Sequence, residues 1–241
     1  GYSSAASDVY KRQRVGKPTC FVVTDIDEST DPPTAWLSRT IVQQKAQDRL
    51  LDSLRPGDVI PARVTHLEPF GAFVDAGCGV PSLIGIENLS VSRICHPSDR
   101  LTVGQSILAA VRTVEPENRR ISLTHRELLG TWAQNAALFS VGETVRGVVR
   151  SIEPYGVFIE LTPNLSGLAE PRADLRPGMA VSVYIKSILP QRMKVKLTVI
   201  DVLAPYDAPT PPRYFITEGH IDEWVYTPAC CDKKNVKTIF G

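Results

Sequence analysis

The chain has 241 residues, 43% of them hydrophobic, and a formal net charge of +1 at pH 7. This length accommodates one large domain or two to three small ones, and the balanced charge excludes a polycation. No stretch approaches the roughly 18 uninterrupted apolar residues of a membrane helix, and no secretory signal pattern is present. We therefore expect a cytoplasmic protein without membrane contact.

The first 13 residues are set apart from the fold. The string SSAASDVYKRQ at 3–13 resembles the in-frame translation of a transposon sequencing adapter. On this interpretation 1–13 is a disordered artefact and the natural N-terminus is missing. A natural disordered tail gives the same fold prediction.

Residues 14–39 resemble the end of a repeat whose complete copies follow. VGKPTCFVVTDID at 15–27 and AWLSR at 35–39 match VGQSILAAVRTVE at 103–115 and ISLTHR at 121–126. This similarity predicts the two C-terminal strands of a truncated repeat, which cannot form a closed domain alone. A linker helix is then predicted over 40–54, where the apolar residues share one stripe and a Pro-Gly pair follows.

An octapeptide is written twice, as EPFGAFVD at 68–75 and EPYGVFIE at 153–160. Around each copy, short segments in which apolar and polar residues alternate indicate β-strands. The alignment of the two copies predicts two small domains of five strands each, 55–124 and 140–200.

The remaining segments connect or follow these domains. A second linker helix is expected over 125–139, with Thr124 as its N-cap and Glu127 completing a capping box. The tail 201–241 carries several prolines and no strand alternation. We therefore expect it to wrap a surface or to be partly disordered.

Each octapeptide holds two aromatic residues three positions apart, with a glycine between them. Side chains of a regular strand alternate between faces, so Phe70 and Phe73 would point apart. A glycine in a strand often marks a bulge, and a bulge at Gly71 would bring both rings to one face; the same holds for Tyr155 and Phe158. Two rings on one exposed face form a stacking platform for unpaired bases. In the alternative, one ring of each pair fills the barrel interior.

These features together resemble the RNA-binding repeat of bacterial small-subunit ribosomal protein number one, the S-one (S1) domain. The resemblance is carried by the entry glycine of each copy, the aromatic-Gly-x-Phe turn and the closing I-S-L-T-x-R, over 55–127, 140–200 and the partial copy at 14–39. It implies a mainly β fold of tandem five-stranded Greek-key barrels of the oligonucleotide/oligosaccharide-binding (OB) type, joined by short α-helices.

The resemblance also implies which residues bind RNA. The family's binding face combines two aromatics, a histidine on the third strand, and an acid and an arginine near the last two strands. Arg120 matches the arginine, Lys194 keeps a cation there and Glu115 is the matching acid, whereas Gly85 and Ala169 stand where the histidine would be. The complete predicted set is Phe70, Phe73, Arg120, Arg146, Arg150, Tyr155, Phe158, Lys186, Arg192 and Lys194.

The second copy is the more basic of the two. Acidic and basic residues balance over 55–130, while 140–200 have a net charge of +3. We expect this excess to attract phosphates, and the alternative is an ordinary solvated surface. The residues that supply it are Arg146, Arg150, Lys186, Arg192, Lys194 and Lys196.

No catalytic, cofactor or metal site is expected. A Walker-type phosphate loop and a serine nucleophile elbow are absent, and the four histidines, His66, His96, His125 and His220, occur in unrelated sequence contexts. The five cysteines, Cys20, Cys78, Cys95, Cys230 and Cys231, form no C-x-x-C pair. Neither a disulfide framework nor a zinc site is therefore predicted.

The sequence thus predicts a non-catalytic protein that binds single-stranded RNA through two weak barrels acting together. By resemblance, its partners would be messenger RNA and the small ribosomal subunit, in translation. Two alternatives stay open. One is an RNA-binding appendage of a larger enzyme, such as an RNA-processing nuclease or an isoprenoid reductase fusion, and the other is a protein-docking barrel that has lost RNA affinity.

Overall fold

The structure, a computed structural model, describes residues 20–204, 211–232 and 235–241. The adapter-like segment 1–13 lies outside the described residues. Contacts divide the chain into two compact units with a boundary between Arg49 and Leu50, and each unit is described by itself.

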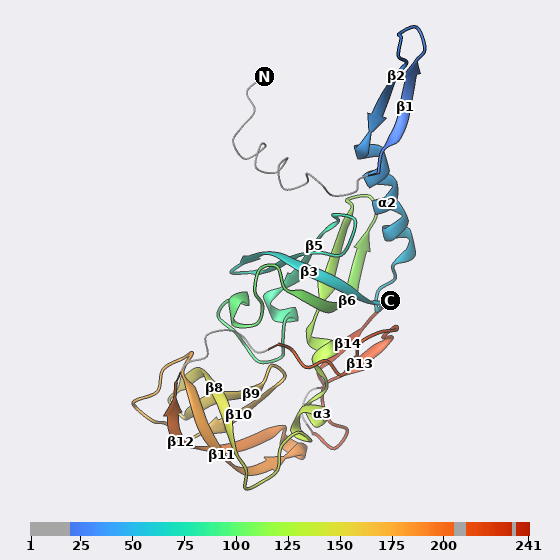
Figure 1. The fold of residues 1–241 in the computed structure, drawn as a ribbon. Helices are drawn as coiled ribbons and strands as arrows, with labels where there is room; N and C mark the ends of the chain where they lie inside the picture. Colours follow the sequence, from blue (N-terminus) through green and yellow to red (C-terminus); the bar gives the residue numbers. More distant parts are fainter. Residues whose placement is uncertain (1–19, 205–210, 233–234) are drawn as a thin grey trace. The chain divides into compact units, whose positions relative to one another are not determined.

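The described part of the first unit is a β-hairpin that leads into a helix. β1 (Val22–Asp27) pairs antiparallel with β2 (Thr34–Ser38), and α2 (Arg39–Ser53) follows and continues into the second unit (Figure 1). The hairpin exposes large apolar side chains, among them Ile26 and Trp36. An isolated two-stranded hairpin is marginally stable at best. The assignment of 14–39 to the end of a repeat stays a prediction.

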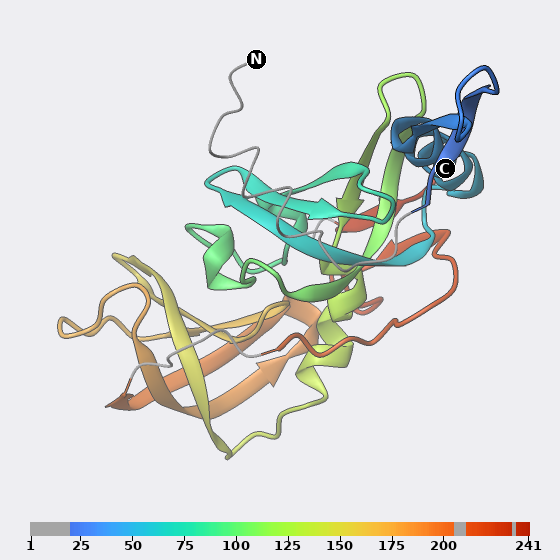
Figure 2. The ribbon, with the colours of Figure 1, turned by 45° about the horizontal axis from the view of Figure 1, so that its top comes forward.

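The second unit contains two closed five-stranded barrels (Figures 1 and 2). In each barrel the spatial order of the strands is first, second, third, fifth, fourth; the third and fifth strands are parallel and every other pair is antiparallel. This topology confirms the predicted mainly β fold of tandem OB-type barrels. The first barrel comprises β3 (Val59–Glu68), β4 (Gly71–Asp75), β5 (Pro81–Gly85), β6 (Ser106–Glu115) and β7 (Arg120–Thr124). The second comprises β8 (Thr144–Glu153), β9 (Gly156–Thr162), β10 (Leu165–Ala169), β11 (Ala180–Leu189) and β12 (Lys194–Leu203).

Strand alternation separates the core of each barrel from its outer face. In β7, Ile121 and Leu123 are buried while Arg120 and Ser122 lie outside. The corresponding strand β12 buries Val195 and Leu197 and exposes Lys194 and Lys196. The outer residues of these strands are therefore available for a binding surface.

The repeated glycine does not form the bulge that the sequence predicts. Gly71 is the first residue of β4, and Phe70 precedes the strand in a turn. The register shift lies instead in the first strand, between Val64 and His66, and the second barrel repeats it in β8. Gly71 is required for a close approach, because a Cβ there would lie 2.4 Å from the carbonyl oxygen of Ile84.

The single linker helix expected over 125–139 is wrong. The structure has a 3-10 helix, η3 (Arg126–Leu129), and a short helix, α3 (Trp132–Ala136). Gly130 separates them with a φ of +86°, a backbone conformation that favours glycine. Thr124 is the last residue of β7 and not an N-cap. The capping box is formed instead by Thr131 and Gln134 at the start of α3.

The tail contains strands that its composition did not predict. β13 (Glu223–Val225) and β14 (Lys237–Ile239) pair antiparallel. Trp224, Tyr226 and Phe240 are buried in a hydrophobic cluster that contains the second barrel's core and also residues of the first barrel and of the connecting helices. The described tail is therefore part of the folded unit. Burial of its aromatic side chains stabilises it there although its backbone is irregular and rich in proline.

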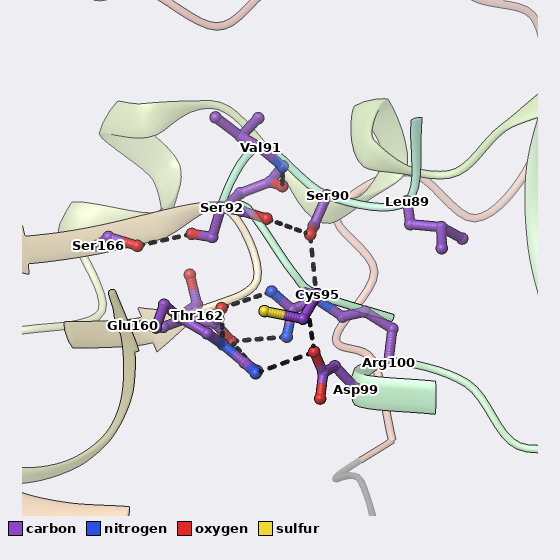
Figure 3. A network of polar contacts seen from close by, with 12 residues as sticks. Leu89, Ser90, Val91, Ser92, Cys95, Asp99, Arg100, Glu160, Thr162 and Ser166 are labelled. Atoms are coloured by element: carbon purple, nitrogen blue, oxygen red, sulfur yellow. Dashed lines mark hydrogen bonds and ion pairs between the residues drawn. The ribbon is translucent and has the colours of Figure 1, made fainter. Parts of the chain in front are cut away.

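The two barrels meet where the segment 89–101 of the first contacts β9 and β10 of the second (Figure 3). At the centre of this interbarrel contact, Arg100 Nη1 donates to Glu160 Oε1 at 2.7 Å, and Arg150 Nε donates to Glu160 Oε2 at 2.8 Å. Ser92 Oγ lies 2.7 Å from Ser166 Oγ. Charge-assisted, bidentate bonds of this kind hold two surfaces in one geometry.

Tyr214 of the tail binds the first barrel and the residue that follows it, His125, beside segment 89–101. The hydroxyl of Tyr214 accepts from the backbone N–H of Leu108 and lies 3.1 Å from Nε2 of His125. The other ring nitrogen of His125 contacts the carbonyl oxygen of Leu89. A carbonyl only accepts, so Nδ1 carries the proton and Nε2 accepts from the tyrosine. Burial lowers the pKa of His125 to about 4, so this histidine is neutral at pH 7.

None of the helices in the described ranges has the length and apolar character that a membrane span requires.

Candidate nucleic-acid interface

The first barrel presents a pair of exposed rings at the turn between β3 and β4. Phe70 is 56% exposed, and Phe73 is half-buried on the outer face of β4. Their ring centroids are 6.0 Å apart and the planes meet at 87°. The two rings therefore share one side of the barrel, as the sequence predicts, although the turn rather than a bulge places Phe70 there.

The second barrel repeats this arrangement. Tyr155 is 67% exposed, and its ring centroid lies 6.2 Å from that of Phe158 at an interplanar angle of 90°. No ring of either pair belongs to the buried core. The alternative in which one ring of each pair fills the barrel interior is therefore wrong.

Strand register places the inner ring of each pair in a row of outward-facing residues that crosses the sheet. Neighbours in this row lie about 4.8 Å apart, the spacing of paired strands. In the first barrel the row is His66, Phe73, Leu83, Ser122 and Thr113. In the second it is Ser151, Phe158, Leu168, Lys196 and Ser187.

The cations predicted on the last strand of each barrel lie on the same outer face as the rings. Arg120 and Lys194 are exposed and precede the row residues of β7 and β12 by two positions. Lys196 lies in the row itself, two strands from Phe158. Sequence analysis counted Lys196 toward the charge of the second barrel and left it out of the predicted site.

Lys186 and Arg192 belong to the β11–β12 hairpin. Lys186 is exposed on β11 and its Nζ lies 3.3 Å from Oε1 of Glu170. Arg192 is exposed in η4 (Pro190–Arg192), which joins the two strands. Both face solvent, so both stay available to a phosphate.

Arg150 and Arg146 are not placed with the rings. Arg150 has a side chain that is 14% exposed, and it is bound to Glu160 and lies 3.6 Å from Asp99. Arg146 donates to the carbonyl oxygen of Ala204 at 2.7 Å. The expectation that Arg150 holds a phosphate is therefore wrong, because its guanidinium is already paired with the carboxylate of Glu160 within the interbarrel contact.

Glu160 is the residue that sequence analysis missed in this contact. It stands in the repeat at the position of Asp75, which accepts from the backbone N–H of Gly77 in a local turn. Glu160 faces two arginines instead. The two environments differ because Arg150 stands where the first barrel has Thr65, and because segment 89–101 of the first barrel brings Arg100 to Glu160.

The structure also corrects which residue of the second barrel stands where the family's binding face has a histidine. Ala169 pairs with Val157 as Ile84 pairs with Ala72, so the counterpart of Gly85 is Glu170 and the assignment to Ala169 is wrong by one residue. His66 lies on the opposite flank of Phe73, with ring centroids 6.3 Å apart. Sequence analysis placed His66 in no site, although its position two residues before the repeated octapeptide was visible.

Among the described residues, no group of three or more His, Cys, Asp or Glu side chains is arranged to hold a metal ion.

Comparison with known proteins agrees with this geometry. The family model described as S1 RNA binding domain matches residues 53–126. The chain is 32% identical over 190 residues to the small ribosomal subunit protein bS1 of Staphylococcus aureus strain COL, with 71% of this chain and 48% of that protein covered. It is 30% identical over 193 residues to the bS1 protein of Staphylococcus saprophyticus, with the same coverage.

The chain thus spans about half the length of the curated relatives it matches. Among solved structures, a crystal structure of an a/eIF2alpha-aDim2p-rRNA complex from Pyrococcus horikoshii OT3 aligns with a TM-score of 0.31 and 24% identity. That alignment covers 35% of this chain and 51% of the other.

Proposed function

We propose that this chain, which belongs to the S1 RNA-binding domain family, binds single-stranded RNA through the outer faces of its two barrels and catalyses no reaction. The observation that carries the proposal is the pair of exposed rings on each barrel, Phe70 with Phe73 and Tyr155 with Phe158. Aromatic rings on a sheet surface stack unpaired bases with little sequence preference, each base contributing about 1 to 3 kcal/mol.

The charges around the rings support binding of the RNA backbone. Arg120 lies on the ring-bearing face of the first barrel, and Lys194 and Lys196 lie on that of the second. Lysine and arginine near a stacking platform neutralise phosphates and release counterions, which makes affinity depend on salt. The second barrel is expected to contribute more of this salt-dependent attraction.

We further propose that the RNA is messenger RNA and that the protein acts at the small ribosomal subunit in translation. The support is the similarity to bS1 proteins, whose name places them in that subunit. The similarity covers part of those proteins, so this role is a proposal about the larger assembly rather than about the two barrels.

Fluorescence anisotropy of a labelled, unstructured RNA of about a dozen nucleotides, a length suited to two such barrels, tests RNA binding. We expect salt-sensitive binding that weakens when Phe70 and Phe73, or Tyr155 and Phe158, are changed together to alanine. Thermal unfolding of each variant controls for folding. Binding that survives both double changes would overturn the stacking mechanism, and absence of binding at low salt would favour the protein-docking alternative.

A further inference from the structure

The first barrel carries a third ring beside its ring pair. His66 on β3 is opposite Phe73 in the strand register. The two ring centroids are 6.3 Å apart, and the planes are inclined by 31°. Phe73 in turn contacts Phe70, so three rings form one continuous aromatic surface.

A carboxylate holds the imidazole in place. Nε2 of His66 lies 2.6 Å from Oε1 of Glu68, and the two side chains are 62% and 39% exposed. Because a carboxylate oxygen accepts, Nε2–H is the donor. The bond restricts the rotation of the imidazole while leaving its face accessible, which reduces the entropy lost when a ligand stacks on it.

The second barrel provides a natural comparison. Ser151 occupies the position of His66, opposite Phe158, and Glu153 follows it by two residues as Glu68 follows His66. The second barrel therefore has the ring pair and the carboxylate without the third ring. Its own row contains Lys196 where the first barrel has Ser122.

We infer that His66 is a third base-stacking residue of the first barrel, positioned by Glu68, so that an unpaired RNA strand meets three rings there and two on the second barrel. This inference rests on the proposed RNA binding. Imidazole rings stack on nucleobases as phenylalanine and tyrosine rings do. The first barrel thus binds mainly through bases, and the second adds more phosphate contacts.

Two substitutions at one position separate the ring from the hydrogen bond. His66→Gln keeps a side-chain donor for Glu68 and removes the ring, whereas His66→Phe keeps a ring and removes the donor. Both are made in the full chain with Tyr155 and Phe158 changed to alanine, so that binding reports the first barrel. We expect His66→Gln to weaken binding of a labelled 12-nucleotide RNA by about fivefold or more, and His66→Phe to stay within about twofold of the parent.

Adding a histidine to the second barrel tests the same inference through a gain of RNA affinity. Ser151→His, in a chain with Phe70 and Phe73 changed to alanine, is expected to tighten RNA binding by about fivefold. The slope of log affinity against log salt is expected to stay constant in His66→Gln, because loss of stacking releases no counterions. Thermal unfolding confirms that each variant is folded.

The outcomes distinguish this inference from the proposed function. If removal of the ring pairs abolishes binding while His66→Gln does not weaken it, the third ring is overturned and RNA binding stands. If His66→Gln and His66→Phe weaken binding equally, an aromatic ring at this position is not sufficient for binding and the inference also fails. If the unsubstituted chain binds no RNA, the proposed function and this inference fail together.

Discussion

Arg100 of the first barrel and Glu160 of the second form a bidentate ion pair in which both side chains are more than nine-tenths buried. Arg150 approaches the same carboxylate from β8. One glutamate therefore accepts from two arginines, and the arginines belong to different barrels. This shared carboxylate links the two barrels and, with them, the two faces proposed to bind RNA.

Neutralising that carboxylate is expected to destabilise the fold. Glu160→Gln leaves Arg100 and Arg150 buried without an anionic partner between them, and removal of one partner from a buried ion pair costs about 3 to 5 kcal/mol. Urea unfolding measures the loss. The matched control is Glu170→Gln, which breaks the exposed pair with Lys186 and is expected to cost at most about 1 kcal/mol. Equal losses in the two variants would contradict a buried, interbarrel role for Glu160.

Much of the fold follows from local patterns in the sequence. Alternation around the repeated octapeptide predicts both barrels, because each strand has one face in the core and one in solvent. The linker 125–139 fails for a specific reason. Its apolar spacing suits a helix, but Gly130 adopts a positive φ and the Phe215 ring occupies the space that a Cβ would need. Phe215 comes from a segment more than 80 residues away, which no local pattern reveals.

The candidate site shows the same division. The ring pairs were predictable because both rings lie within eight consecutive residues. Arg150 was misassigned because its partner Glu160 lies on the paired strand β9 of the same barrel, and because the covering segment 89–101 reaches it only through the packing of one barrel on the other. Charge alone does not distinguish an arginine that faces solvent from one that is bound to a carboxylate.

The tail is expected to contribute to stability through its buried aromatic residues. Trp224 is 4% exposed and its ring centroid lies 5.6 Å from that of Tyr226. Trp224→Ala removes this packing and is expected to lower the free energy of unfolding by about 3 to 5 kcal/mol. Val225→Ala, at the exposed neighbouring position, is expected to change it by less than about 1 kcal/mol. If the tail only lay on the surface without stabilising the fold, urea unfolding would show similarly small changes in the free energy of unfolding for both variants.

Acid is expected to destabilise the fold through His125. Burial lowers the pKa of His125 to about 4, from 6.5 in the unfolded chain. Above pH 6.5 His125 is neutral in both the folded and the unfolded chain, so its ionisation does not change the free energy of unfolding. Between pH 6.5 and 4 only the unfolded chain takes up the proton, so the free energy of unfolding falls by about 3 kcal/mol in total as the pH drops.

Urea unfolding at pH 7 and at pH 4.5 measures this loss. In His125→Gln the difference between the two pH values is expected to shrink, whatever the absolute stability of the variant. A difference that is the same in both proteins would assign the acid sensitivity to other groups.

Lys194 and Lys196 of the second barrel are expected to govern salt dependence. Changing both to alanine removes two proposed phosphate contacts from the ring-bearing face. The slope of log affinity against log salt is then expected to flatten by about 0.7 for each lysine. Lys237→Ala, on the separate β13–β14 sheet where Lys237 pairs with Glu223, is the control for loss of a positive charge away from the ring-bearing face. An unchanged slope in the lysine pair would exclude these residues from the RNA path.

The tail also sets the order in which the unit can be completed during synthesis. Tyr214 contacts the backbone of Leu108, 106 residues earlier, and Thr238 donates to the buried Glu127, 111 residues earlier. Chains emerge with their N-terminal part first, and contacts between distant residues form slowly. During synthesis on the ribosome, Glu127 and the N–H of Leu108 therefore gain their tail partners only after both barrels have been made. The packing of the tail is consequently a late step of folding.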